Sequence, residues 1–344
     1  MPSLLERVVE ALFGSAAGKA PDIDQPLVDD AIDAFVETVE PRLKLHGGYR
    51  TRLDGNVRAT IAHLRVLGRQ VPSDTILLTR AAWADDPYVR AVFAAASDVP
   101  AAIGRSEELR RFFDEHPACD EAVAVLGMRR EERQVFAPKL EDGVLRQDVP
   151  QTTVGFAGHV LVAPAQAAEH TRLEIGHRIV LRLAQLVLAR VVALGEKART
   201  LEQDKAMLSV RLRMLRRARD GLQTLVGDHA DTPAQIRELE RELEAAGAEY
   251  VEAKASLATL DGYIEQINAV LANPQSQVAL ERVALRVSRT GVKVDAASPE
   301  PADDLELTEL ALGDGLRATI RLVRVPRSEM PPREDQLARA ASML

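Results

Sequence analysis

The 344-residue sequence predicts an α+β protein, predominantly helical, in which a long antiparallel coiled-coil hairpin interrupts a small antiparallel β-layer. Three observations lead to this prediction. Helical spacings of apolar residues fill the first third of the chain, strand-like alternation occurs on both sides of its centre, and the centre carries a heptad pattern. The expected domains are a bundle of short helices over 1–133, a β-layer over 134–164 plus 276–327, the hairpin over 165–275 and a flexible tail over 328–344.

The first domain is predicted from short amphipathic stripes, which include Leu4 to Phe13 and Val28 to Val39. Asp86-Pro87 supplies a helix N-cap followed by a first-turn proline, and Ser106 caps another helix. A last short helix is expected from Cys119 to Arg130. Together these segments predict a compact helical bundle.

The strand signals fall on either side of the predicted hairpin. Runs that are rich in β-branched residues and bounded by turn residues predict strands. The last pair below is separated by Gly313-Asp314-Gly315, which is typical of a β-hairpin. The predicted strands are Val135–Leu140 with Val144–Val149, Val154–Val162, Val283–Val287 with Val292–Val294, and Leu305–Leu312 with Leu316–Leu322.

The two arms of the hairpin are predicted from their apolar spacing. A 3.5-residue period keeps one stripe of a helix facing a partner helix. The first arm carries an apolar residue at every seventh position: Val180, Val187, Leu194, Leu201, Leu208, Leu215 and Leu222. The second arm follows spacings of three and four without a break: Ile236, Leu239, Leu243, Ala246, Tyr250, Ala253, Leu257, Leu260, Ile264, Ile267 and Leu271.

A single register serves both arms, pairing Leu215 with Ala246 and Leu201 with Leu260. Gly227 is placed to end the first arm, and Thr232 with Pro233 begins the second. Charge agrees with this pairing, because 197–226 holds eight Lys or Arg against three Asp or Glu and 233–273 holds three against eight. A basic arm beside an acidic arm is typical of a paired coil.

Composition narrows the functional classes. The net charge of −8 and the acidic run opposite the arginines at 211–219 argue against nucleic-acid binding. The single cysteine, Cys119, excludes an internal disulfide and fits a reducing compartment. The first residues do not read as a secretory signal, and no apolar run is long enough for a transmembrane helix. We therefore expect a cytoplasmic protein.

One polar cluster could carry chemistry. His170, Glu174 and His177 are spaced by four and three residues, which places them on one helix face, and His159 on a predicted strand could join them. Imidazole and carboxylate groups hold Zn²⁺ and similar divalent metals. A solvated helix face, in which Glu174 pairs with Arg178, explains the same pattern.

We expect a non-enzymatic protein without a cofactor that mediates protein–protein association, as a scaffold, adaptor or chaperone-like protein. The surfaces favoured for binding are the hairpin tip at 220–240 and the apolar face of 179–192, which could also form a homodimer. One alternative is a metal-dependent enzyme or metal-binding protein with its site at His159, His170, Glu174 and His177. Another is a peripheral membrane-associated assembly factor that attaches through Leu4 to Phe13.

In architecture alone, a helical hairpin rooted in a β-layer over 134–327 resembles prefoldin-type chaperones and the adaptor subunits of bacterial efflux and secretion systems. The chain differs from those adaptors because it shows no signal or membrane anchor. It differs from prefoldins in its preceding helical domain. The resemblance implies a protein-binding hairpin, and no functional residue is carried over from either family.

Overall fold

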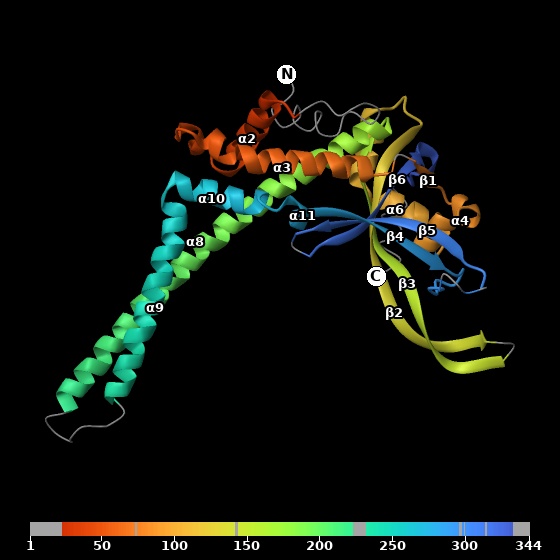
Figure 1. Ribbon diagram of the computed structural model, residues 1–344. Helices are drawn as coiled ribbons and strands as arrows, with labels where there is room; N and C mark the ends of the chain where they lie inside the picture. Colours follow the sequence, from red (N-terminus) through yellow and green to blue (C-terminus); the bar gives the residue numbers. More distant parts are fainter. Residues whose placement is uncertain are drawn as a thin grey trace. The chain divides into compact units, whose positions relative to one another are not determined.

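The computed structural model describes residues 23–72, 74–141, 144–222, 232–295, 298, 300–313 and 315–332. The protein is a mixed helix and sheet structure with a six-stranded sheet and one long helix, α8 (Ala168–Leu222) (Figure 1). It divides into two compact units. We call them the sheet unit, with Ile61–Ile179 and the chain from Pro274 on, and the helical unit, with Ile23–Thr60 and Val180–Asn273. The predicted stripe at 4–13 and the turn at Gly227 lie outside the described residues.

The sheet is the centre of the sheet unit. Its strand order is β3-β2-β6-β5-β4, with antiparallel neighbours, and β1 pairs in parallel with β6. Val292 bridges to Thr153 of β3 and Lys293 bridges to Val287 of β4, so this short segment joins the two outer strands at one end. The strands are β1 (Ile76–Leu77), β2 (Glu121–Glu141), β3 (Val144–Ala165), β4 (Val278–Val287), β5 (Asp303–Leu312) and β6 (Arg317–Pro326).

Short helices complete the sheet unit. Two of the predicted caps are confirmed, because Asp86 accepts the N–H groups of Tyr88 and Val89 and Ser106 Oγ accepts that of Leu109. The helices that lie in this unit throughout are α4 (Ala82–Asp85), α5 (Pro87–Val92), α6 (Asp98–Arg105), α7 (Glu107–Glu115), α11 (Pro274–Gln277) and the 3₁₀ turn η2 (Arg327–Glu329).

The predicted helix from Cys119 to Arg130 is wrong, because this segment enters strand β2 at Glu121. Every residue of 122–128 is buried, so both faces of the strand are covered and the sequence shows no alternation. A short apolar run of this kind does not distinguish a strand from a buried helix. The predicted strands at 144–149 and 154–162 are parts of one long strand, β3. The β5–β6 hairpin is confirmed, with Thr308 opposite Ile320.

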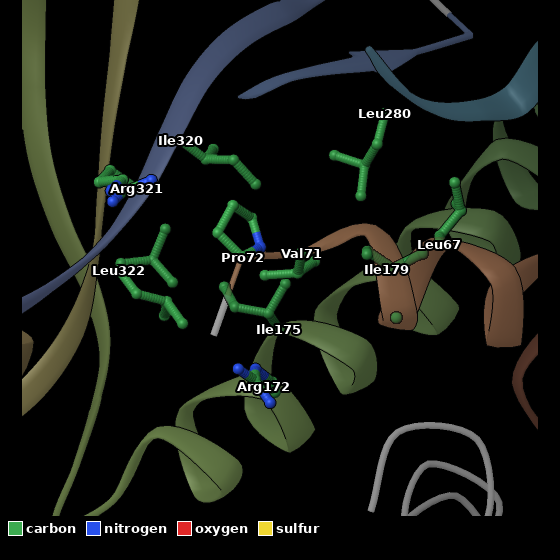
Figure 2. Close-up of a pocket in the computed structure, with 12 residues that line it drawn as sticks. Leu67, Val71, Pro72, Arg172, Ile175, Ile179, Leu280, Ile320, Arg321 and Leu322 are labelled. Atoms are coloured by element: carbon green, nitrogen blue, oxygen red, sulfur yellow. The ribbon is translucent and has the colours of Figure 1, made fainter. Parts of the chain in front are cut away.

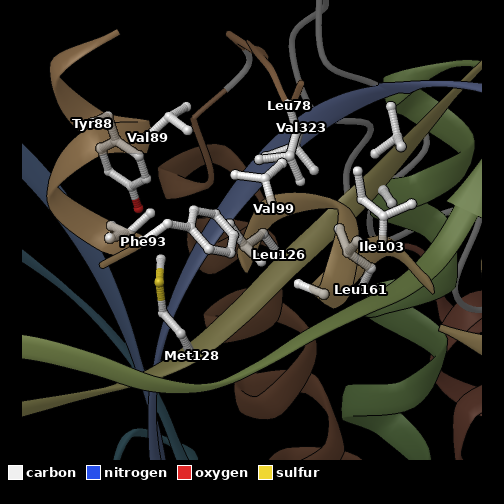
Figure 3. Close-up of a cluster of buried hydrophobic side chains, with 14 of the residues drawn as sticks. Leu78, Tyr88, Val89, Phe93, Val99, Ile103, Leu126, Met128, Leu161 and Val323 are labelled. Atoms are coloured by element: carbon white, nitrogen blue, oxygen red, sulfur yellow. The ribbon is translucent and has the colours of Figure 1, made fainter. Parts of the chain in front are cut away.

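Both faces of the sheet are packed. On one face, Phe93, Val99 and Ile103 from the α5–α6 region cover Leu126 and Met128 of β2 (Figure 3). On the other face a smaller cluster forms, made of Val125, Ile320 and Leu322 with Val71, Val162, Ile175, Leu280, Leu310 and Ala318 beside them. The sheet unit therefore has two apolar clusters of its own, one on each face of the sheet.

The helical unit contains α2 (Gln25–Val39), the 3₁₀ helix η1 (Pro41–Leu45), the first part of α3 (Tyr49–Gln70), the larger part of α8, α9 (Thr232–Ala258) and α10 (Leu260–Leu271). At its base, α3 and α10 are tied by an ion pair between Arg52 and Asp261 and by a 2.8 Å hydrogen bond from Asn56 to Asn268. Beyond the base, α8 and α9 run side by side as a hairpin (Figure 1).

The second arm was predicted to be unbroken, and this is wrong. The helix ends at Ala258, and Thr259 caps a separate helix by accepting the N–H of Gly262 at 3.2 Å. A Cβ at Gly262 would lie 2.3 Å from the carbonyl oxygen of Ser256, so only glycine allows this close corner. The heptad pattern continues through the corner and therefore conceals it.

The predicted register of the arms is also wrong. Leu215 was paired with Ala246, yet it packs beside Leu239 and Leu243, and the adjacent Arg216 binds Glu240. The second arm is thus offset by roughly one and a half helical turns. A repeating seam of leucines is satisfied by more than one register, so periodicity alone does not select between them.

Within the described residues, no helix is both long enough and apolar enough to span a membrane.

Candidate functional site

His159 lies on β3 and is engaged within the sheet unit. Its ring stacks on Phe93 with 4.4 Å between centroids, and its Nε2–H donates to the carbonyl oxygen of Val92 at 2.8 Å. Burial lowers the pKa of His159 below its usual value, and the Val92 carbonyl only partly opposes this effect. His159 is therefore a packed neutral imidazole with a structural partner for its Nε2 atom.

The other three predicted ligands lie on the first turns of α8. His170 and Glu174 line a cleft of about 740 Å³ between α7 and the start of α8. Glu174 Oε1 accepts Arg178 Nε at 3.0 Å, and Glu174 Oε2 lies 3.9 Å from His177 Nδ1. The structure thus places His170, Glu174 and His177 on neighbouring turns. His159 is not among the residues that line this cleft.

An ion pair dominates this cleft. Arg178 donates to both oxygens of Glu108 of α7 at 3.1 and 2.8 Å. The backbone N–H of Ala163, a non-glycine residue with φ of 54°, also donates to Glu108 at 2.9 Å. Burial would raise the pKa of Glu108, but the hydrogen bonds from Arg178 and Ala163 outweigh it and hold this pKa below its usual value. The charges of the cleft therefore fasten α7 to α8.

The described residues contain no group of three or more His, Cys, Asp or Glu side chains placed to hold a metal ion. Two further side chains that could carry chemistry, His116 and Cys119, bind the backbone. His116 Nδ1 contacts the Phe112 carbonyl at 2.9 Å, and the Cys119 thiol donates to the Glu121 carbonyl at 2.9 Å. These two side chains thus have separate backbone partners. The geometry lends the predicted metal site no support.

A second pocket lies on the sheet face that carries Val125, Ile320 and Leu322. Figure 2 shows Ile175, Pro72 and Val71 turned toward Ile320 and Leu322, with Arg172 at the edge. Its interior volume is about 30 Å³, which is space for about one water molecule. Ligand pockets typically measure ~300–1,000 Å³. We read this pocket as a gap in apolar packing.

The hairpin offers a different kind of surface, which is defined by its seam. Leu212, Ile236 and Leu239 are buried between α8 and α9. Arg216 binds Glu240 at 2.5 Å and Lys197 binds Glu249 at 3.3 Å across the pair. The Lys205 ammonium, which interrupts the leucine seam, lies 4.4 Å from the centroid of the Tyr250 ring. This contact turns a polar seam residue into a cation–π pair.

Large apolar side chains lie on the side of α8 that faces away from this seam. Met207, Val210 and Met214 are 67%, 42% and 65% exposed. Their spacing of three and four residues aligns them on one face of the helix. We call these three residues the methionine stripe. The sequence signal was present, but the longer leucine seam concealed it because both patterns share the helical period.

Charge surrounds the methionine stripe. Arg211, Arg213 and Arg217 of α8 are exposed, and none has a carboxylate partner within the described part of the chain. The outer side of α9 is acidic, with Glu242, Glu244 and Glu252 exposed and likewise without an ion-pair partner among the described residues. Each arm therefore carries a charged outer face whose charges remain unpaired within the described chain.

No known protein family, curated protein or solved structure matches this chain in the three comparisons made.

Proposed function

We propose that this protein is a non-enzymatic protein of the cytoplasm that mediates protein–protein association through an antiparallel coiled-coil hairpin. The methionine stripe is the observation that carries the proposal. Three large apolar side chains lie in line on the outer side of a helix and are flanked there by exposed arginines. Burying such a side chain from full exposure is worth about 1.5–3 kcal/mol. These three side chains are already partly buried, so covering them would recover a part of that value, against the cost of association.

The chemistry of the stripe suits a protein partner. Methionine is flexible and polarisable, and it adapts to the side chains of a facing helix. The adjacent arginines add charged groups that orient a partner and speed its association. At ~1.5 Å per residue, the 27 residues of α9 span about 40 Å, which gives the hairpin the length of a helical docking surface.

The test compares two variants that differ only in where they add negative charge. Met207→Glu/Met214→Glu places two carboxylates on the stripe. Ala59→Glu/Ala62→Glu places two carboxylates at exposed positions of α3, on one helix face outside the hairpin. Glutamate is a good helix former, so both variants should fold.

Tagged protein is used for affinity capture from a lysate of the native host, and the retained proteins are identified by mass spectrometry. The proposal predicts that partners retained by the wild type are lost with Met207→Glu/Met214→Glu and kept with Ala59→Glu/Ala62→Glu. Equal retention by all three proteins would show that another surface binds them and would contradict the proposal.

A further inference from the structure

We infer that the methionine stripe is covered by a second copy of this chain, through the acidic outer face of that copy's α9. This inference rests on the proposed function and names the partner. The hairpin of one copy would lie beside the hairpin of the other. The stripe on α8 of one copy would then face α9 of the next copy, and the copies would associate head to tail.

The apolar positions of the two outer faces match in level and size. Lys205 contacts the Tyr250 ring within one hairpin, and the two arms are antiparallel, so Met207 lies at nearly the height of Ala248 and Val251 lies about one helical turn from it. Val251 is 63% exposed, and Ala248 and Ala255 are exposed beside it at spacings of three and four residues. Large methionines opposite a stripe of alanines with one valine give the large-against-small pattern of interlocking helices.

The charges match in the same arrangement. Because Arg216 binds Glu240, the arginines around it lie at the height of the acidic run of α9. Placing α8 of one copy against α9 of the other brings Arg211, Arg213 and Arg217 to the exposed Glu242 and Glu244. Opposite charges across an interface favour this pairing over its alternatives.

Charge also disfavours the simplest alternative assembly, in which the methionine stripes of two copies face each other. Packing stripe against stripe would bury the same methionines, but it would bring the arginines of two α8 helices together. Like charges at an interface are destabilising. The stripe and the acidic face lie on opposite outer sides of one hairpin, so the α8-to-α9 contact joins two different faces and can repeat from copy to copy.

Disulfide trapping tests the arrangement directly. Both chains carry Cys119→Ser, which removes the only native cysteine. One chain carries Met207→Cys, and a second chain, distinguished by a larger tag, carries Val251→Cys or Ala248→Cys. The inference predicts that mixing and mild oxidation link the two different chains, while Met207→Cys alone stays unlinked. A link between two Met207→Cys chains, with none between Met207→Cys and either α9 position, would overturn it.

Charge reversal gives a second test that does not depend on disulfide geometry. Arg211→Glu/Arg213→Glu/Arg217→Glu and Glu242→Arg/Glu244→Arg/Glu252→Arg should each be monomeric in sedimentation velocity, because each places like charges across the α8-to-α9 contact. In a mixture of the two variants, every α8-to-α9 contact between unlike copies joins opposite charges, so mixed assemblies should form. Two variants that stay associated on their own would overturn the inference.

The same instrument separates this inference from the proposed function. Wild type and Ala59→Glu/Ala62→Glu should sediment as dimers or larger oligomers, and Met207→Glu/Met214→Glu should sediment as a monomer. A wild type that stays monomeric at about 100 µM would overturn the second-copy inference. The Kd of self-association would then be weaker than about 100 µM, which corresponds to less than ~5 kcal/mol of binding free energy. The proposed function would still stand if captured host proteins depend on the stripe.

Discussion

The sheet unit and the helical hairpin use apolar residues in opposite ways. In the sheet unit, a run of seven successive strand residues, 122–128, is buried, and helices cover them on both faces. In the hairpin, the described seam buries Leu212, Ile236 and Leu239, while Met207, Val210 and Met214 remain exposed. The sheet unit therefore completes its own core, whereas the hairpin carries apolar surface that none of the described residues of the chain covers.

This difference predicts where stability and association reside. Substitutions of buried residues in the sheet unit should lower the free energy of unfolding by the same amount at every protein concentration. Substitutions on the outer face of the hairpin should leave folding unchanged and alter assembly. Substitutions at seam and corner positions of the helical unit should lower the free energy of unfolding by an intermediate amount, because these positions are packed on one side only.

The largest effect is expected for Phe93→Ala. Phe93 is almost completely buried and stacks on His159, so its removal loses apolar burial and leaves a cavity. Such substitutions cost about 3–5 kcal/mol of unfolding free energy. Urea denaturation followed by circular dichroism measures it. A loss below about 1 kcal/mol would show that the α5–sheet contact does not form as described.

The α9–α10 corner predicts the next effect. Gly262→Ala forces a Cβ against the Ser256 carbonyl, and overpacking against rigid backbone costs about 3 kcal/mol, the upper end of its usual range. Gly247→Ala is the matched control, because a Cβ there meets no atom within 4 Å. The control should stabilise α9 by about 0.5–1 kcal/mol. A Gly262→Ala variant as stable as this control would mean that the corner is absent.

Leu212→Ala should cost about 2 kcal/mol, the lower end for a leucine, because its seam neighbours Leu208, Leu215 and Leu243 are only partly buried. Hydrogen exchange should show faster exchange in α9 and unchanged exchange in β2. Equal acceleration in both elements would contradict the separation of the hairpin from the sheet unit in stability.

The smallest effect concerns pH. Burial lowers the pKa of folded His159 below its ordinary value of 6.5, so the unfolded chain binds the proton more readily. The stability associated with the neutral ring is therefore present above about pH 6.5 and is lost as pH falls below it. His159→Gln should reduce this loss between about pH 7.5 and about pH 5.5 in thermal unfolding. An identical slope in both proteins would refute the assignment.

Sequence reasoning succeeded where a pattern has a single structural meaning. Ser106, Asp86 and the β5–β6 turn predicted local structure correctly, because caps and turns are decided by neighbouring residues. It failed at Cys119–Arg130, where burial on both faces removed the alternation. It also failed at Thr259–Gly262, where a heptad pattern continues across a corner.

The candidate site was harder to predict. Three of the proposed ligands, His170, Glu174 and His177, do lie close on α8, but tertiary contacts decide the partners of their neighbours. Glu108 of α7 is distant in sequence, and it accepts hydrogen bonds from Arg178. His159 is held by Val92 and Phe93. The methionine stripe was readable in principle, since its spacing is helical, but its exposure depends on which face of α8 receives α9.

Methionine oxidation tests the central claim on the unmodified protein. Purified wild type is treated with dilute hydrogen peroxide at high and at low protein concentration, and sulfoxide formation is followed peptide by peptide. Met128 is buried in the sheet and should react slowly at both concentrations. The account predicts that Met207 and Met214 react several-fold more slowly at high concentration, because a second copy covers them. Equal rates for these two residues at both concentrations would contradict it.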